Sequence, residues 1–305
     1  MNDWFTLSIL GLFIAVLGIL LFIYLKEWRL IKYCEQIIKK NSLTFYKAFS
    51  QIDNKKQRHA IYVVYAFCRY ADDLIDEHQD IDGLNKLEKE LADFRDNKKT
   101  TLRVFRALKL IKDNFYGNDY DFKPYFEMIK GQRIDITIKS YETLEDVLSY
   151  CYYVASSVGL MLLPILAPKK HHELREFAIQ LGYAMQITNF LRDVGEDFKK
   201  GRIYIPQSLL KTYNIQIKEE MIEGPSERFK HLFDELSGIA RNYYQYAYDH
   251  IDAFSKDVSK PLLYAAKLYE AILDECITDY DVFRQKHFVI QEKKIAIIKQ
   301  LQKTL

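Results

Sequence analysis

The stretch Cys68-Arg-Tyr-Ala-Asp-Asp-Leu-Ile-Asp76 decides the fold class of this chain, together with a second stretch, Asn189-Phe-Leu-Arg-Asp-Val-Gly-Glu-Asp197. Around both, over residues 55–77 and 172–198, apolar residues recur at three- and four-residue spacing. This spacing predicts two long α-helices. On a helix, positions 65, 69, 72 and 76 share one face, as do positions 186, 189, 193 and 197, so each helix presents a polar stripe that ends in acids.

The rest of the chain also favours helices. Glycine and proline contribute 11 and 6 of 305 residues, about half of their usual share, which argues against barrels, sandwiches and α/β folds. Only residues 202–206 resemble a strand. We therefore expect an all-α protein with a single large α-helical domain. Further helices are expected at about residues 29–40, 82–96, 101–115, 122–133, 143–163, 206–213, 226–255 and 259–300, with breaks allowed inside the last two.

The N-terminus contains a long apolar run. Residues 4–25 carry no charge, and as a helix they span about 33 Å, enough to cross a hydrocarbon core of about 30 Å. A cleaved signal peptide is the alternative, but it would carry a basic segment before a shorter run. Lys26, Arg29 and Lys32 follow the run, which predicts that its C-terminal side is cytoplasmic. We expect a single-pass membrane protein with an anchor at residues 1–26 and a cytoplasmic catalytic domain at residues 27–305.

Charge and cysteine usage exclude several classes of function. The net charge is only +2, whereas a nucleic-acid-binding protein usually carries a strong basic excess, so we expect no nucleic-acid partner. The four cysteines lie far apart and form no Cys-x-x-Cys pair. A zinc site or a disulfide framework is therefore not expected.

The two acidic stripes predict a metal site. Carboxylates at positions i and i+4 of a helix lie about 5–6 Å apart, and at an effective dielectric constant of about 20 each like-charged pair costs about 3 kcal/mol. A cation would relieve this repulsion, and ligands that are all oxygen favour Mg²⁺ or Mn²⁺. Arg69 and Arg192 precede the acids by one turn and could contact a diphosphate. The alternative is that each acidic run is only a solvated helix face.

Longer motifs resemble one protein family. The two stretches quoted above, with Gly201-Arg-Ile-Tyr-Ile-Pro206 after the second, look like the two signatures of the squalene/phytoene synthase family. Tyr150-Cys-Tyr-Tyr-Val-Ala-Ser-Ser-Val-Gly159 and Ser42-Leu-Thr-Phe45 are similar to two more of its segments, and the likeness extends over about residues 30–295. The resemblance implies an isoprenoid-synthase-type fold. It also implies head-to-head condensation of two prenyl diphosphates, through a cyclopropyl diphosphate, to a linear polyene.

The resemblance also implies roles for individual residues. The expected cofactor is Mg²⁺, or Mn²⁺ in its place, bound by Asp72, Asp73, Asp76, Asn189, Asp193, Glu196 and Asp197. The expected contacts to the diphosphate and the prenyl tail are Ser42, Phe45, Phe49, Tyr65, Arg69, Gln186, Asn189 and Arg192. The expected catalytic residues are Tyr150, Arg69, Arg192 and Tyr269, although each tyrosine taken alone could equally be a core aromatic residue.

Two positions depart from the family pattern. Leu43 stands where related C30 enzymes often have a lysine, so one contact to diphosphate is in doubt. Lys286 stands about where a family arginine would be, and lysine cannot make the bidentate contact of a guanidinium group.

The expected product is dehydrosqualene (4,4′-diapophytoene), a C30 polyene made from two farnesyl diphosphates for carotenoid biosynthesis. Phe45 and Phe49 share a helix face, and a ring at position 49 would occupy the space that a longer tail needs. Alternatives are phytoene synthesis from geranylgeranyl diphosphate, squalene synthesis with NADPH, a class I terpene cyclase, or a non-catalytic membrane scaffold. Phe49 could also pack only against neighbouring helices. A downstream desaturase is the expected protein partner.

Overall fold

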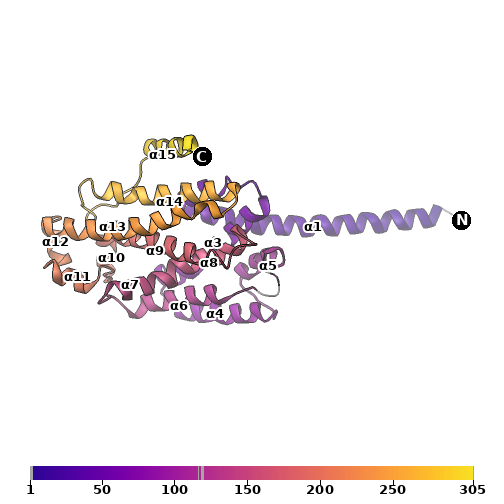
Figure 1. Ribbon diagram of the computed structural model, residues 1–305. Coiled ribbons are helices and arrows are strands. Elements are labelled where there is room, and N and C mark those ends of the chain that lie inside the picture. The colour runs from indigo at the N-terminus through magenta and orange to yellow at the C-terminus, as the bar shows by residue number, and fades with distance from the viewer. Residues whose placement is uncertain (1–2, 116, 118–119, 305) are drawn as a thin grey trace.

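A computed structural model describes residues 3–115, 117 and 120–304 of the chain (Figure 1). Its α-helices are α1 (Asp3–Asn41), α2 (Leu43–Phe49), α3 (Lys55–Asp76), α4 (Ile81–Arg95), α5 (Arg103–Phe115), α6 (Lys123–Thr137), α7 (Leu144–Cys151), α8 (Ser157–Leu166), α9 (Arg175–Arg192), α10 (Val194–Lys199), α11 (Gln207–Thr212), α12 (Ile217–Glu223), α13 (Glu227–Asp249), α14 (Lys256–Cys276) and α15 (Gln291–Thr304). A π-helical turn, Tyr152–Ser156, joins α7 to α8, and a 3₁₀ turn, Ile251–Ala253, precedes α14. Within the described residues no strand forms, which confirms the all-α prediction.

The two helices predicted around the acidic stretches lie in the core. Helix α3 is capped by Asn54, whose side chain accepts hydrogen bonds from two backbone N–H groups of the first turn. It packs against α1, α5 and α8, while α9 packs against α8, α13 and α14. Because these helices are apolar over most of their surface, they are buried on several sides. Their C-terminal ends, which carry the acids, are thereby held inside one continuous bundle.

Helix α1 is one continuous helix from Asp3 to Asn41 (Figure 1). It projects from the bundle (Figure 1), and residues 8–29 are exposed, whereas Leu30, Cys34 and Ile38 are buried against the body. This helix is long and apolar enough to cross a membrane. The expected boundary at residue 26 therefore falls within a helix, which continues from the apolar run into the body. Leu144–Leu166 is also long and apolar enough to span a membrane, but it is shorter and less apolar, and much of it is buried in the body, as expected for a core helix.

The prediction of one helix over residues 172–198 was wrong. Helix α9 ends at Arg192, and α10 starts at Val194, because Asp193 leaves the helical conformation (φ −107°, ψ 16°). The N–H of Gly195 donates to the carbonyl of Val282 at 3.1 Å. A Cβ atom on Gly195 would lie 2.1 Å from the carbonyl oxygen of Phe283, so only glycine permits this approach. A distant segment therefore packs against the chain at the break.

Two other stretches differ from a simple helical pattern. The expected helix over 259–300 is interrupted by residues 277–290, which contribute the contact to Gly195. The strand-like residues 202–206 are extended, and Ile203 forms an isolated parallel bridge with Ser140. This bridge holds the chain after α10 against the end of α6.

Candidate active site

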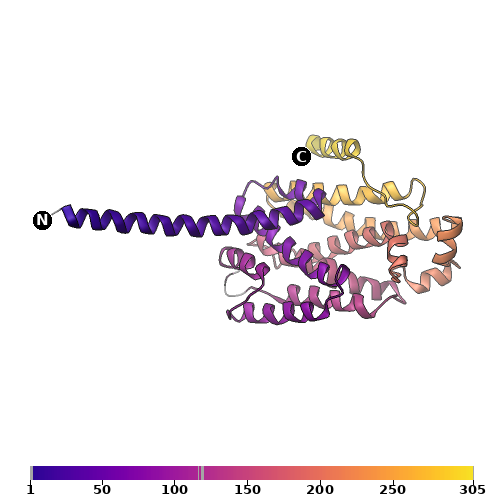
Figure 2. The same cartoon turned by 180° about the vertical axis from the view of Figure 1, so that it is seen from behind.

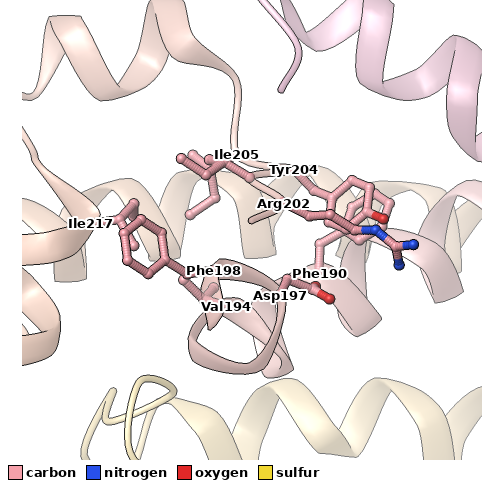
Figure 3. A pocket seen from close by; sticks show the side chains of 9 residues that line it. Phe190, Val194, Asp197, Phe198, Arg202, Tyr204, Ile205 and Ile217 are labelled. Carbon is pink, nitrogen blue, oxygen red and sulfur yellow. The ribbon is translucent and has the colours of Figure 1, made fainter. Parts of the chain in front are cut away.

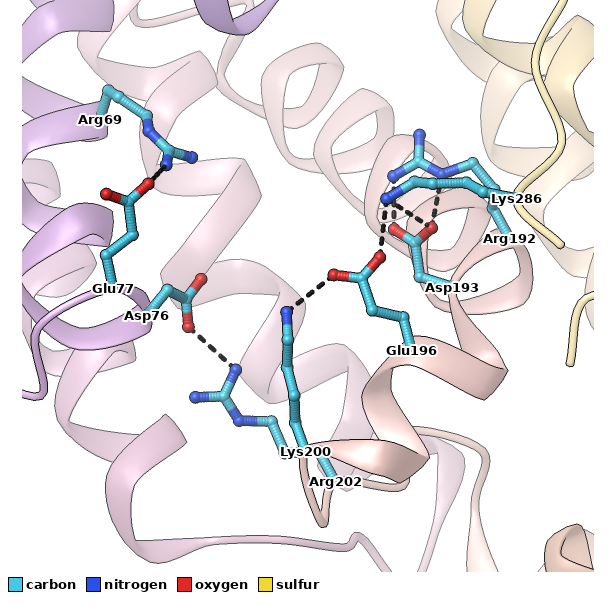
Figure 4. Close-up of polar contacts among 9 residues, drawn as sticks. All are labelled: Arg69, Asp76, Glu77, Arg192, Asp193, Glu196, Lys200, Arg202 and Lys286. Carbon is cyan, nitrogen blue, oxygen red and sulfur yellow. Dashed lines mark hydrogen bonds and ion pairs between the residues drawn. The ribbon is translucent and has the colours of Figure 1, made fainter. Parts of the chain in front are cut away.

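The structure brings the two acidic stretches together. Arg202, which follows the second stretch, donates from Nη1 to Asp76 Oδ1 of the first at 3.0 Å. In Figure 4, Asp76 lies on one side of the Lys200 and Arg202 side chains, and Asp193 and Glu196 lie on the other. We call Asp72, Asp73 and Asp76 the α3 acids, and Asp193, Glu196 and Asp197 the α10 acids.

The α3 acids occupy one unbroken helix end. Asp72 is half-buried and accepts a hydrogen bond from Gln132 Nε2 at 2.6 Å. Burial, together with the charge of Asp76, raises the pKa of the Asp72 carboxyl to about 7. Asp73 instead pairs with Arg69, which also contacts Glu77 at 2.7 Å. Asp76 is thus the α3 acid that contacts the segment following the α10 acids, through Arg202.

The α10 acids are surrounded by basic side chains (Figure 4). Asp193 accepts from Arg192 Nε at 2.8 Å and lies 3.1 Å from Lys286 Nζ. Glu196 contacts both Lys286, at 3.0 Å, and Lys200, at 2.8 Å, and these cations lower its pKa to about 2. Lys286 comes from the segment between α14 and α15, so the position that departs from the family pattern lies directly at these acids.

Asp197 differs from its two neighbours. Burial and the charge of Asp193 raise the pKa of its carboxyl to about 7. It lines a pocket with about 230 Å³ of empty space, which is shown in Figure 3. Arg202, Tyr204 and Phe190 line the same pocket. Each acidic stretch therefore contains a carboxyl, Asp72 or Asp197, whose pKa burial and a neighbouring carboxylate raise to about 7.

The donor set fits a hard divalent cation. Across the described residues, no three acidic, histidine or cysteine side chains converge on one point. Magnesium commonly uses one or two carboxylates and takes its other ligands from phosphate and water. Each acidic stretch offers such a partial set, and a cation would offset the repulsion that raises the pKa of Asp72 and Asp197. Arg69 Nε is buried without a hydrogen-bond partner, so a donor is available for a phosphate oxygen.

A second cluster surrounds Tyr150. Its hydroxyl donates to Asp135 Oδ2 at 2.6 Å, and the hydroxyl of Tyr204 donates to Asp135 Oδ1 at 2.9 Å. Phe190 stacks on Tyr204 with ring centroids 4.2 Å apart. Asp135 and Gln132 were not among the site residues expected from the sequence. Both side chains are buried on α6 and directed at the site. The sequence feature that could have indicated them is their i, i+3 spacing, which places two polar residues on one helix face.

Tyr269 connects α2 to two polar residues of α9, Asn189 and Gln186. Its hydroxyl donates to Asn189 Oδ1 at 2.5 Å, and Asn189 Nδ2 donates to Gln186 Oε1 at 3.2 Å. The ring of Tyr269 stacks on Phe45, with centroids 5.6 Å apart and planes within 2°. The Phe49 ring follows at 6.0 Å from Phe45. Ring contacts therefore run from Tyr269, which is bonded to the α9 residue Asn189, through Phe45 to the buried Phe49.

The remaining expected site residues contribute less directly. Tyr65 is half-buried on α3, near Arg69 and Asp72, and its burial raises the pKa of its hydroxyl. Ser42 precedes α2, and its side chain makes no capping hydrogen bond. Leu43 is exposed and lines a groove between α2, α14 and α15. The structure therefore places Ser42 at the edge of the helix that carries Phe45, with no described contact to either set of acids.

Comparison with known proteins gives a consistent result. Residues 38–292 match the family model for squalene/phytoene synthase. The 4,4′-diapophytoene synthase of Staphylococcus haemolyticus is 34% identical over 278 residues, which cover 89% of this chain and 96% of that protein. The 15-cis-phytoene synthase of Synechococcus elongatus is 32% identical over 282 residues, covering 86% and 89%. A crystal structure of a dehydrosqualene synthase with bound ligand is 38% identical, with a TM-score of 0.85 and coverage of 92% and 98%.

Proposed function

Because this chain belongs to the squalene/phytoene synthase family, we propose that it joins two farnesyl diphosphates head to head into dehydrosqualene. The observation that carries the proposal is the contact of Arg202 with Asp76, which holds the α3 acids and the α10 acids on facing sides of one site. A scaffold protein would not need two complete acidic sets directed at each other. Two diphosphate groups bound in one site, by contrast, need cations near both the α3 acids and the α10 acids.

The proposed cofactor is Mg²⁺, with Asp72, Asp76, Asn189, Asp193 and Asp197 as its protein ligands. When bound, it would neutralise the charge that develops on a departing diphosphate. Arg69 and Arg192 lie beside the two acidic sets and would bind phosphate oxygens as the diphosphate leaves. These residues stabilise the leaving group, so the first substrate ionises to an allylic cation that the double bond of the second attacks. Closure of a three-membered ring with loss of one proton then gives a cyclopropyl diphosphate.

The aromatic residues serve the second half of the proposed reaction. Tyr150, Tyr204 and Phe190 form a stacked wall, and Asp135 holds the two hydroxyl groups. Ring faces stabilise a passing carbocation, and the closely packed wall excludes water that would quench it. In this half the cyclopropyl diphosphate loses its diphosphate group, and the resulting cation rearranges and then loses a proton to give the linear polyene.

The proposal also specifies the length of the prenyl chain, C15 rather than C20. Phe49 is 6% exposed, and its ring lies 6.0 Å from that of Phe45 on α2. A prenyl tail that runs along α2 would meet both rings. We expect the purified protein with Mg²⁺ to prefer the C15 over the C20 diphosphate. Phe49→Leu should narrow this preference by about 10-fold, because a pocket discriminates one or two carbons by about 1–3 kcal/mol. The measurement is hydrocarbon formed from each substrate, identified by mass spectrometry.

Phe94→Leu is the matched control, since Phe94 is an equally buried ring between α4 and α5. It should leave the ratio of C15 to C20 turnover unchanged. A wild-type preference for C20 would favour the second candidate, phytoene synthesis, which the 32% identity to a phytoene synthase supports. Added NADPH tests the squalene alternative, because a reduced C30 product would appear only with that cofactor.

We further propose that α1 anchors the protein in a membrane with its body in the cytoplasm. Deleting residues 1–26 should release a soluble protein that retains turnover, because Leu30, Cys34 and Ile38 keep their contacts with the body. Fractionation and the hydrocarbon assay measure both effects. A fluorescent tag at the N-terminus that proves cytoplasmic would contradict the orientation.

A further inference from the structure

One end of the body surrounds the point where α1 emerges (Figures 1 and 2). Helix α5 lies against α1 there, with the Arg103 guanidinium 3.6 Å from the centroid of the Tyr33 ring. The start of α3 joins this end, since Lys56 Nζ lies 3.5 Å from Asn114 Oδ1 of α5. The end of α8 is also adjacent, because Gln57 Nε2 donates to the carbonyl of Ile165 at 2.8 Å. Three segments that are distant in sequence thus share one face.

This face is basic. We define the basic face as five exposed side chains from the start of α3, from α5 and from the loop after α8: Lys55, Arg106, Lys109, Lys169 and Lys170. None of them forms an ion pair with any side chain that the structure describes. On α5 the opposite surface is apolar and buried, so Arg106 and Lys109 necessarily point outward. Glu173 is an exposed acid on the same loop as Lys169 and Lys170.

The basic face lies close to the end of the apolar run. Tyr33, which α5 contacts through Arg103, is eight residues beyond Leu25, or about 12 Å along the helix. Lys26 and Arg29 are exposed on α1 between these points and continue the positive charge toward the membrane. The electrostatic attraction of an anionic leaflet falls off over a Debye length, about 8 Å at physiological salt. Long basic side chains at this end can therefore reach that field.

We propose that the basic face docks on the anionic phospholipid headgroups of the membrane that α1 spans. This inference rests on the proposed anchor and is independent of the proposed reaction. Docking would hold the body at one orientation on the bilayer surface. Helix α3 starts at this face and its 22 residues end at the acids, so the acids would lie about 30 Å from the membrane surface, on the aqueous side.

The test uses the full chain in nanodiscs of phosphatidylcholine, with or without phosphatidylglycerol. A fluorophore is attached after Glu173→Cys, since the native cysteines are all buried. Energy transfer to a labelled lipid then reports how close the loop lies to the headgroups. We expect transfer to rise by about twofold or more with phosphatidylglycerol. The rise should vanish in about 1 M NaCl, where the Debye length is about 3 Å.

The decisive experiment compares two double variants, each of which replaces two basic residues by glutamate. R106E/K109E should abolish the rise with phosphatidylglycerol. K218E/R228E should leave it intact, because these exposed residues lie on α12 and α13 at the opposite end of the body (Figure 1). Equal transfer in both lipids, or a rise that survives R106E/K109E, would overturn the proposal. Melting temperatures near the wild-type value would establish that both double variants are folded.

Discussion

The α3 acids and the α10 acids have similar sequences but are built in different ways. Asp72 and Asp76 are four residues apart on one unbroken helix, so local helical geometry sets their spacing. Asp193 and Asp197 also lie four residues apart, but a helix break separates α9 from α10 at Asp193. The spacing at the α10 acids therefore depends on what holds the break in place.

Contacts from residues 277–290 hold this break. The carbonyl of Val282 accepts from Gly195, and Lys286 lies between Asp193 and Glu196. Among the described residues, no comparable long-range cation reaches the α3 acids except Arg202, which comes from the other stretch. One half of the site is therefore local in origin, whereas the other half is assembled by tertiary contacts. Perturbing residues 277–290 should therefore affect the α10 acids selectively.

The largest expected effect comes from removing the buried carboxyl of either set. Asp72→Asn and Asp197→Asn should each lower kcat by about 100- to 1,000-fold, because a charge-stabilising group at the leaving diphosphate is lost. EDTA should abolish turnover of the wild type, and added Mg²⁺ should restore it. The assay is hydrocarbon formation from farnesyl diphosphate. Glu77→Gln is the control, since Glu77 pairs with Arg69 and should change kcat far less. Equal turnover by all three variants would contradict the metal-site assignment.

A smaller effect is expected from disturbing the helix break. In Gly195→Ala the new methyl group would collide with the backbone of Phe283, displacing α10 and lowering kcat by about 10- to 100-fold. The same strain should lower the free energy of unfolding by about 1–3 kcal/mol.

Gly238→Ala is the matched control on α13, where no neighbouring atom would lie within 4 Å of the new methyl group. It should raise stability by about 0.5–1 kcal/mol, read as a higher melting temperature. If Gly195→Ala behaved like this control, the α10 acids would not depend on the tertiary contact.

The smallest expected effect is on how the melting temperature depends on pH in the absence of metal. The α3 acids and the α10 acids should both contribute to it. The folded state raises the pKa of Asp72 and of Asp197 to about 7, against about 4 in an unfolded chain. Between these values the folded state binds more protons, so its free energy of unfolding falls as pH rises. The melting temperature in EDTA should therefore decrease from about pH 5 to about pH 7.5. Glu196, whose pKa is lowered to about 2, titrates below this window.

The control for the pH dependence is the double variant D72N/D197N, which should melt with a flatter pH profile. Added Mg²⁺ should raise the wild-type melting temperature more at the upper pH, because protons compete with the cation for the same oxygens. A wild-type profile in EDTA that matches that of the double variant would show that these two carboxyls ionise normally.

Sequence reasoning succeeded where a side chain's role follows from local spacing. The spacing over residues 55–77 predicts a helix with Asp72 and Asp76 on one face, and α3 has that form. The same reasoning was wrong for residues 172–198, because the break at Asp193 depends on a carbonyl of Val282 that periodicity cannot reveal. Asp135 and Gln132 were overlooked for a related reason. Isolated polar residues on a helix resemble surface positions until packing buries them.

The all-α class, the apolar N-terminal helix and the residue types of both acidic stretches were predictable from the sequence. These features follow from composition and from periods of three to four residues, which act over one helix at a time. Three contacts arise from tertiary packing instead: Arg202 bonds to Asp76, Lys286 lies at the α10 acids, and Asp135 accepts hydrogen bonds from Tyr150 and Tyr204. Each of these contacts joins helices or loops distant in sequence, and it exists only because burial of the apolar faces brings those segments together.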